Sequence, residues 1–194
     1  MLNFTLCQKE NESDKYHQNL LEQKNIAAII SLASISENST ILDVECGAKI
    51  ALSELLLKKP AKLVGIDASN MAGKETKNYI RDNRVQLTHT NLFDVEDTFD
   101  IVFIYNSYLQ FTDKVAFAKK TASLLSKYGR FIIAFNKSRE HSNFINKKSL
   151  NHTTTELYSV YREAIIFKDW FHIDIMVDTS ELYILSGVKK FTSC

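Results

Sequence analysis

Two acidic residues that follow short apolar segments are the side chains of this sequence best placed to hold a polar ligand. Asp43 lies near the end of "TILDV", and Asp67 closes "KLVGID". A carboxylate at the end of a buried strand can accept hydrogen bonds from two ribose hydroxyls, and the spacing of the two acids is close to the roughly 20 residues of dinucleotide-binding folds. Two interpretations of Asp67 stay open: a ribose contact, or a cap for a helix that begins in "ASNMAG".

The loop after the first acid reads "ECGAK" (45–49) and holds a single glycine, Gly47. A glycine lets backbone approach a ligand because no Cβ stands in the way. Side chains on Glu45 and Lys49 narrow such a loop, and we expect them to restrict it to negative φ. Glu45 either obstructs a ligand or binds a positive charge on it. Lys49 opposes the positive end of the helix dipole by roughly a few tenths of a kcal/mol.

Composition narrows the class of protein. The chain has 194 residues, enough for one domain with a real core, and its 45% apolar and 24% charged residues are typical of a soluble globular protein. The formal net charge of +1 gives no overall field that would attract nucleic acid or a membrane surface. No apolar run approaches the ~20 residues that span a bilayer, and the first residues lack the pattern of a secretory signal.

Cysteines and histidines form no metal-binding pattern. Cys7, Cys46 and Cys194 are far apart and make no CxxC pair, so we expect no disulfide framework and a reducing, cytoplasmic environment. The five histidines show no HxxxH or HExxH spacing, so we expect no metal site. Cys46 is interpreted as a small buried residue rather than a reactive thiol.

Strands and helices alternate along most of the chain. Strands are predicted over 40–44, 62–67, 84–92, 99–105, 130–135, 172–177 and 181–188. Helices are predicted over 17–34, 49–59, 70–83, 112–129 and 155–167. The polar segment 136–154 is interpreted as a long connection. Only three residues separate the last two strands, too few for a crossover, so these strands must form an antiparallel hairpin.

This order of elements predicts an α/β fold. Short strands that are nearly continuous in apolar residues are typical of a parallel sheet with helices on both faces. We expect a Rossmann-like, doubly wound, mostly parallel seven-stranded sheet that ends in the antiparallel hairpin. A single domain over 1–194 is expected, with an N-terminal helical segment over 1–38 and the α/β core over 39–194. The N-terminal segment, which includes Tyr16 and His17, is either a lid over the pocket or a helix packed on the sheet edge.

Four stretches carry a resemblance to a known family. "LDVECGAK" has an acid and a glycine after the first strand, and "VGIDAS" has an acid after the second. "TNLFD" follows the third strand, and "FDIVFIYNSYLQF" contains the fourth strand and its loop. Together with "LLSKYGRFIIAF" and the hairpin, they resemble the class I S-adenosylmethionine-dependent methyltransferases over about Tyr16 to Lys189.

The chain also departs from the pattern of that family. Relatives usually carry an acid-x-G-x-G-x-G loop, which this sequence matches at Asp43 and Gly47 but not at Glu45 and Lys49. Tyr128 stands where a glycine is commoner. These departures support an alternative function, that of a catalytically inactive methyltransferase-like protein acting as a binding or interaction module.

The resemblance implies that S-adenosyl-L-methionine is the cofactor and that a methyl group passes by in-line displacement at its sulfonium. It implies no catalytic residue, because a base is needed only for an acceptor that arrives protonated. The implied cofactor contacts are Asp43, Glu45, Cys46, Gly47, Asp67, Ala68, Asn91, Leu92 and Tyr105.

Several of these residues keep a second interpretation. Asp43 meets the cofactor ammonium or orients loop amides, or it only caps the loop. Asn91 and Leu92 give a polar contact and an apolar wall for adenine, or they form an ordinary strand end. Tyr105 faces the cofactor or belongs to the core.

A small molecule is the expected methyl acceptor. Relatives that methylate nucleic-acid bases carry a Pro-Pro-aromatic signature after the fourth strand, and "YNSYLQF" has no proline. No nucleic-acid or membrane partner is expected. The basic residues Lys137, Arg139, Lys147 and Lys148 are interpreted as a solvated loop, or alternatively as a contact to substrate. A nicotinamide-dependent oxidoreductase is disfavoured, because "ECGAKI" lacks G-x-G-x-x-G.

Overall fold

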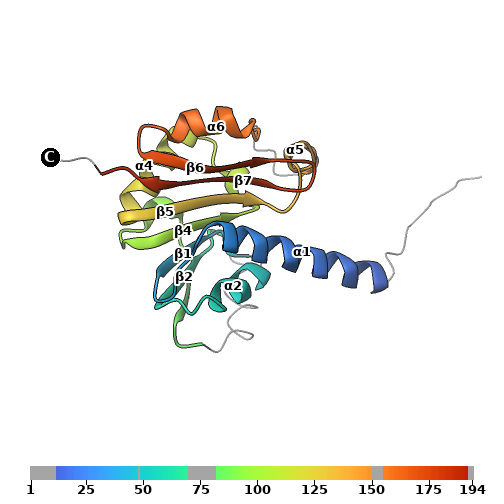
Figure 1. Ribbon diagram of the computed structural model, residues 1–194, viewed down its shortest axis with the longest axis horizontal. Coiled ribbons are helices and arrows are strands. Elements are labelled where there is room, and N and C mark those ends of the chain that lie inside the picture. Colours follow the sequence, from blue (N-terminus) through green and yellow to red (C-terminus); the bar gives the residue numbers. More distant parts are fainter. Residues whose placement is uncertain (1–11, 48, 70–81, 150–154, 192–194) are drawn as a thin grey trace, which may run out of the picture.

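The computed structural model describes residues 12–47, 49–69, 82–149 and 155–191, and its central feature is one seven-stranded sheet (Figure 1). The strand order is β3-β2-β1-β4-β5-β7-β6. The strands are β1 (Thr40–Val44), β2 (Lys62–Ile66), β3 (Val85–Thr88), β4 (Phe99–Tyr105), β5 (Leu125–Phe135), β6 (Phe171–Asp178) and β7 (Tyr183–Lys189). Neighbours from β3 to β5 run parallel, whereas β7 is antiparallel to both β5 and β6. The predicted fold class and the predicted hairpin are confirmed.

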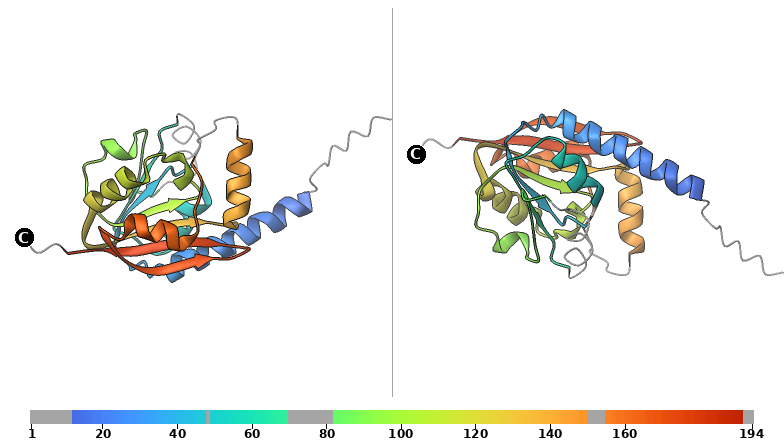
Figure 2. Two further views of the ribbon diagram at one scale, coloured as in Figure 1. Left: turned by 90° about the horizontal axis from the view of Figure 1, so that it is seen from above. Right: turned by 90° about the horizontal axis from the view of Figure 1, so that it is seen from below.

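Helices cover both faces of this sheet, as predicted (Figure 2). The helices are α1 (Glu12–Leu32), α2 (Lys49–Leu56), α4 (Lys114–Leu124), α5 (Arg139–Lys148) and α6 (Val160–Phe167), with 3-10 helices η1 (Leu92–Asp94) and η2 (Tyr108–Gln110). α1 and α2 pack on one face through residues such as Ile29 and Leu52. α4 and α6 pack on the other face through residues such as Phe117 and Phe167. No helix among the described residues is both long and apolar enough to cross a bilayer.

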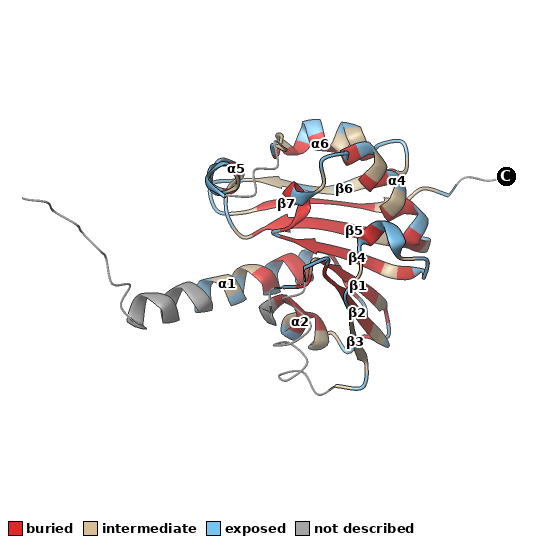
Figure 3. Cartoon of the chain, turned by 180° about the vertical axis from the view of Figure 1, so that it is seen from behind, coloured by how far each residue is buried: buried red, intermediate tan, exposed pale blue. Residues whose placement is uncertain are grey.

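Successive side chains of β4 point to opposite faces of the sheet, so this one strand contributes to the apolar cluster on each face. Val102 and Ile104 belong to the cluster under α4 and α6, while Phe103 and Tyr105 belong to the cluster under α1 and α2. Successive side chains of a strand point to opposite faces, so a strand that is apolar throughout must be covered twice. Figure 3 shows the resulting buried centre of the sheet.

The N-terminal helix starts earlier than predicted, at Glu12 rather than His17, and ends at Leu32. Its second half is firmly packed, because Ile26, Ile29 and Ile30 are at most 1% exposed. These contacts show a helix packed on a face of the sheet, over central strands such as β4 and β5, and not on the sheet edge as expected. A lid role for its first turns stays a prediction.

The prediction of a long polar connection over 136–154 is wrong, because this segment contains α5. Ser138 caps the helix by accepting a hydrogen bond on its Oγ from the backbone N–H of His141 (3.1 Å). Glu140 lies in the first turn and two lysines lie in the last, which is the charge order that the helix dipole favours. The capping signal therefore outweighs the low apolar content of the segment.

Other predicted elements are shorter in the structure. The helix predicted over 112–129 ends at Leu124, because Leu125 starts β5 and pairs with Phe99. The helix predicted over 49–59 ends at Leu56, the one over 155–167 begins only at Val160, and the strand predicted over 84–92 is Val85–Thr88. Most of the helix predicted over 70–83 lies outside the described residues. Tyr128, where a glycine is commoner, takes a left-handed φ of 66°.

Candidate functional site

Three carboxylates meet where β1 and β2 end. Asp43 pairs with Gly65 across the two strands, so Asp67 and Glu45 follow at the same edge of the sheet. The backbone N–H of Cys46 donates to the carbonyl of Ile66 (3.0 Å), which keeps the loop after β1 against the end of β2. This edge, at the carboxyl ends of parallel strands, is where open α/β sheets bind ligands.

Asp67 supports both interpretations at once, because its two oxygens have different surroundings. Oδ1 accepts hydrogen bonds from the N–H and the hydroxyl of Ser69 (2.7 and 2.6 Å), which is the turn-capping role. A Cβ added to Gly47 would lie 3.4 Å from Oδ2 and would meet no other atom that closely. Among the described residues Oδ2 accepts no hydrogen bond. Oδ2 of Asp67 can therefore accept a hydrogen bond from a ligand hydroxyl. The neighbouring backbone of Gly47 carries no side chain that would block the ligand.

Glu45 contradicts the expectation of negative φ in this loop, since its φ is +58°. A residue with a Cβ takes the left-handed conformation at a cost of about 1–2 kcal/mol. Its carboxylate accepts a hydrogen bond from the N–H of Ala68 (3.4 Å), which links the loop after β1 to the turn after β2. The chain therefore has a backbone conformation that usually favours glycine, yet places a half-buried carboxylate beside Asp67.

Asp43 is the most deeply buried of the three acids, at 1% exposed. Its Oδ2 has no hydrogen-bond partner among the described residues. Burial, and then repulsion from Asp67, raises the pKa of Asp43 to about 8. The same two causes raise the pKa of Glu45. No ion pair in the described part of the chain joins any of these three acids to a Lys, Arg or His, so the edge is acidic and has no cationic partner there.

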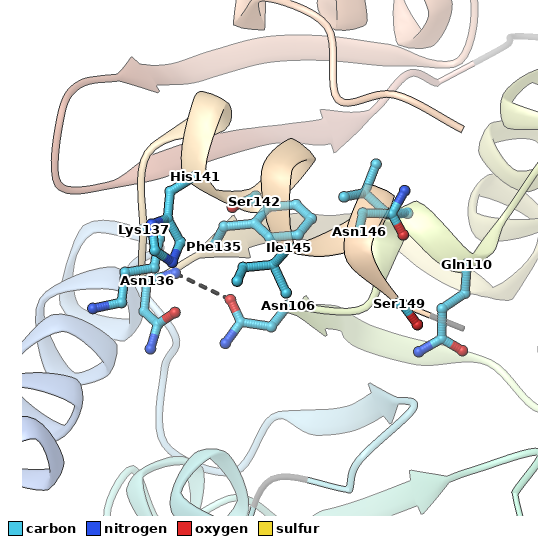
Figure 4. Close-up of a pocket in the computed structure, with 11 residues that line it drawn as sticks. Asn106, Gln110, Phe135, Asn136, Lys137, His141, Ser142, Ile145, Asn146 and Ser149 are labelled. Carbon is cyan, nitrogen blue, oxygen red and sulfur yellow. Dashed lines mark hydrogen bonds between the residues drawn. The ribbon is translucent and has the colours of Figure 1, made fainter. Parts of the chain in front are cut away.

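A larger cavity of about 680 Å³ lies beyond the ends of β4 and β5, under α5 (Figure 4). Phe135 and Ile145 lie in its middle, with Lys137 and His141 towards one end and Gln110 towards the other. The remaining lining residues are Asn106, Leu109, Asn136, Ser142, Asn146 and Ser149. None of the described lining residues is acidic, in contrast to the edge formed by β1 and β2.

The cavity and the acidic edge are joined by the loop after β4. The buried hydroxyl of Ser107 donates to the carbonyl of Val44 at the end of β1 (3.1 Å). Asn106 takes a left-handed φ of 56°, and its Oδ1 accepts a hydrogen bond from the N–H of Asn136 (3.1 Å). Asn106 therefore lines the cavity one residue away from a direct contact with β1.

Comparison with known sequences identifies a domain within the chain. Residues 42–133 match the sequence model of a family described as a methyltransferase domain. The matched part holds all three acids of the edge, strands β2 to β4, and most of β1 and β5. Residues 42–133 therefore carry a methyltransferase domain. No curated protein sequence matches this chain.

Solved structures share the fold of this chain at low sequence identity. It is similar to a structure of the complex between the Trm112 methyltransferase activator and the putative methyltransferase of Haloferax volcanii (TM-score 0.72, 16% identity, covering 92% of this chain and 96% of that chain). It is also similar to a putative S-adenosylmethionine-dependent methyltransferase from Listeria monocytogenes (0.68, 14%, 87% and 99%). A third similar structure is magnesium protoporphyrin IX methyltransferase from Synechocystis PCC 6803 with bound SAH (0.64, 21%, 93% and 88%).

Three of the predicted cofactor contacts already have structural roles within the protein. Asn91 caps η1, because its Oδ1 accepts from the N–H of Phe93 (2.9 Å). Leu92 is fully buried in the core. Tyr105 is 4% exposed and donates its hydroxyl hydrogen to Oε1 of Glu22 on α1 (3.3 Å). Cofactor contacts from these residues stay predictions.

Sequence reasoning missed residues of β3 that line the edge. A small space of about 10 Å³, room for roughly one water, lies between Cys46, Gly65, Asp67, Ser69, Leu87, Thr88 and His89. A Cβ on Gly65 would lie 2.7 Å from both Cys46 Sγ and Leu87 Cδ2, so glycine is needed here for β2 to pack this closely. Thr88 ends β3 and His89 follows it, so both lie at the same edge of the sheet as Asp67. This position in the sequence was the signal that could have identified them. Cys46 is buried, as predicted, and burial raises the pKa of its thiol to about 12.

The basic residues of segment 136–154 divide between two roles. Lys137 lines the large cavity. Arg139 instead pairs with Asp178 on β6 (Nε–Oδ2, 3.1 Å) and with Glu140, so it fastens the start of α5 to the hairpin. Lys147 and Lys148 are exposed in the last turn of α5.

We predict that Asp43→Asn changes how stability depends on pH. Because the folded pKa of Asp43 lies above the unfolded value of about 3.9, the folded state holds an extra proton between about pH 4 and 8, and wild-type stability falls as pH rises through this window. The variant lacks this titration, so its stability relative to wild type should rise by at least about 1 kcal/mol from pH 5.5 to 7.5. Urea unfolding at both pH values measures the difference. A constant offset from the buried amide leaves the slope unaffected, and equal pH dependence of the two proteins would contradict the prediction.

Proposed function

We propose that this methyltransferase binds S-adenosyl-L-methionine at the edge formed by Asp43, Glu45 and Asp67, and transfers its methyl group to a small molecule held in the 680 Å³ cavity. The observation that carries the proposal is the cluster of three acids at this edge, which has no cationic partner among the described residues. A cytoplasmic location and a single-domain organisation remain parts of this proposal.

The chemistry of the edge suits this cofactor. S-adenosylmethionine carries an ammonium and a sulfonium, and its ribose offers two hydroxyl donors. Oδ2 of Asp67 is an acceptor beside the open backbone of Gly47, and Oδ2 of the buried Asp43 lacks a partner among the described residues. A buried polar atom without a partner is costly to the fold and is often matched by a ligand or water. The bound cofactor supplies a methyl group that its positive sulfur has already activated.

The residues of the chain mainly hold the cofactor and orient it relative to the methyl acceptor. Asp67 holds the ribose, and Ser107 keeps the loop after β4 against β1, so that the cofactor edge and the cavity keep a fixed relation. Phe135 and Leu109, each at most 6% exposed, give the cavity an apolar floor that excludes water. We assign no general base, because none is needed for an acceptor that arrives deprotonated.

The size and lining of the cavity support a small acceptor. Small-molecule sites have volumes of roughly 300–1,000 Å³ and combine apolar walls with a few polar groups. The cavity of about 680 Å³ fits this range, and amides such as Asn106 and Asn136 accompany the apolar floor.

Transfer of a tritiated methyl group from the cofactor to fractionated cell extract tests the proposal. We expect label in the small-molecule fraction and none in protein or RNA. Ile145→Trp should fill the cavity and reduce this transfer at least about tenfold, without changing the affinity for S-adenosylhomocysteine. Ile165→Trp, at a similarly exposed position on α6 (62% against 53% for Ile145), is the matched control and should behave as wild type. Label that appears in protein or RNA, or transfer that Ile145→Trp leaves intact, would contradict the small-molecule acceptor.

A binding module without activity is the second candidate function. The hydrogen bond between Glu45 and the N–H of Ala68 favours it, because the carboxylate then lies where relatives leave a glycine loop open. One solved structure of the same fold is a complex with a methyltransferase activator. Binding of S-adenosylhomocysteine without transfer to any fraction would favour this candidate.

A further inference from the structure

Resting on the proposed function, we infer that Glu45 makes this site select the cationic cofactor over its neutral product. The methyl donor and S-adenosylhomocysteine share their adenosine, ammonium and carboxylate. They differ at the sulfur, which loses both its methyl group and its positive charge in the reaction. A fixed negative charge near that sulfur should therefore bind the methyl donor more tightly than the product.

Backbone geometry holds the carboxylate of Glu45 in place. The left-handed φ of +58° turns the chain directly after β1, and the hydrogen bond from the N–H of Ala68 fixes the carboxylate next to Asp67. Glu45 is half-buried, so water screens its charge less than on an open surface. Residues strained in this way persist only when the surrounding structure supports them, and they gather at ligand sites.

The position of Asp67 connects Glu45 to the sulfur. Asp67 Oδ2 is the proposed acceptor for the ribose hydroxyls, and the sulfur is bonded to the 5′ carbon of the same ribose. Glu45 accepts a hydrogen bond from the N–H of Ala68, the residue after Asp67, so its carboxylate lies beside the turn that presents the proposed ribose acceptor.

No cation among the described residues neutralises the charge of Glu45, so this charge can act on a ligand. No described Lys, Arg or His forms an ion pair with Glu45, Asp43 or Asp67. Burial, and then repulsion from Asp67, raises the pKa values of Asp43 and Glu45, so like charges contribute to both shifts. A cation relieves this repulsion and a neutral ligand does not. Loss of the sulfonium charge on methyl transfer would therefore favour release of the product.

Calorimetric titration of the full chain tests this selection, with S-adenosylmethionine, S-adenosylhomocysteine and sinefungin, in which an amine-bearing carbon replaces the methylsulfonium. We expect wild type to bind both cationic ligands at least about tenfold more tightly than S-adenosylhomocysteine. Glu45→Gln keeps the size of the side chain and an acceptor for the N–H of Ala68, yet removes the charge. It should lose the preference while binding S-adenosylhomocysteine within about twofold of wild type. Glu96→Gln, at an exposed position outside the site, is the matched control and should keep the preference.

The outcomes separate this inference from the proposed function. If wild type binds all three ligands equally, the selection is refuted and the cofactor site stands, and this comparison needs no variant. An equal loss of affinity for all three in Glu45→Gln would show a structural role, and an equal gain would show that Glu45 obstructs the site. Both results refute the selection. If wild type binds none of the three ligands, the proposed function and the selection fail together.

Discussion

We expect Asp67→Ala to weaken the binding of S-adenosylhomocysteine at least about tenfold. A hydrogen bond to a charged group contributes about 1.5–3 kcal/mol, and about 1.4 kcal/mol corresponds to a tenfold change in affinity. Asp67 is 6% exposed, so little water can replace the lost carboxylate. Isothermal titration calorimetry measures the change, with circular dichroism to verify the fold.

Two further variants separate the ribose contact from the turn cap. Asp67→Asn keeps an oxygen for the N–H of Ser69 but removes the charge, and should weaken binding less than the alanine variant does. Glu96→Ala removes an exposed acid outside the site and should leave the affinity unchanged. Wild-type affinity in a folded Asp67→Ala protein would refute the ribose contact.

Lys114→Met should have the largest effect on stability, lowering the free energy of unfolding by about 3–5 kcal/mol. Lys114 donates from Nζ to the carboxylate of Glu163 and to the carbonyl of Glu156 (2.6 Å). Glu163 is fully buried, and also accepts hydrogen bonds from the hydroxyl of Tyr108 and the N–H of Tyr158, both at 3.0 Å. Removal of the lysine leaves a buried carboxylate without its cation.

A double variant isolates that unpaired charge as the cause. Lys114→Met with Glu163→Gln removes both charges and should recover part of the lost stability in urea unfolding. Lys119→Met, on the exposed side of α4, is the control and should change stability by less than about 0.5 kcal/mol. If the double variant is no more stable than Lys114→Met, the buried charge is not the cause of the loss.

Local patterns were sufficient to predict the sheet. The apolar strands β1, β2 and β4 carry their own signal, and the short gap between β6 and β7 allows only a hairpin. α5 was missed because its cap at Ser138 stands before a helix with few apolar residues. Helix ends such as Leu124 depend on pairing with a distant strand, here through Leu125 and Phe99, which no local pattern shows.

Only part of the site could be predicted from the sequence. Asp43 and Asp67 were identified because they lie at the ends of recognisable strands. The left-handed φ of Glu45 depends on the N–H of Ala68, 23 residues later in the chain, so the expectation of negative φ failed. The large cavity could not be predicted without α5, which forms one of its walls. The hydrogen bond between Tyr105 and Glu22 likewise joins elements far apart in sequence.

Native mass spectrometry of the purified full chain, titrated with S-adenosylmethionine and S-adenosylhomocysteine, tests cofactor binding most directly. We expect one cofactor per chain with the methyl donor, a smaller bound fraction with the product at equal concentration, and loss of both adducts in Asp67→Ala. The absence of any adduct to wild type at millimolar ligand would contradict cofactor binding at the edge of β1 and β2.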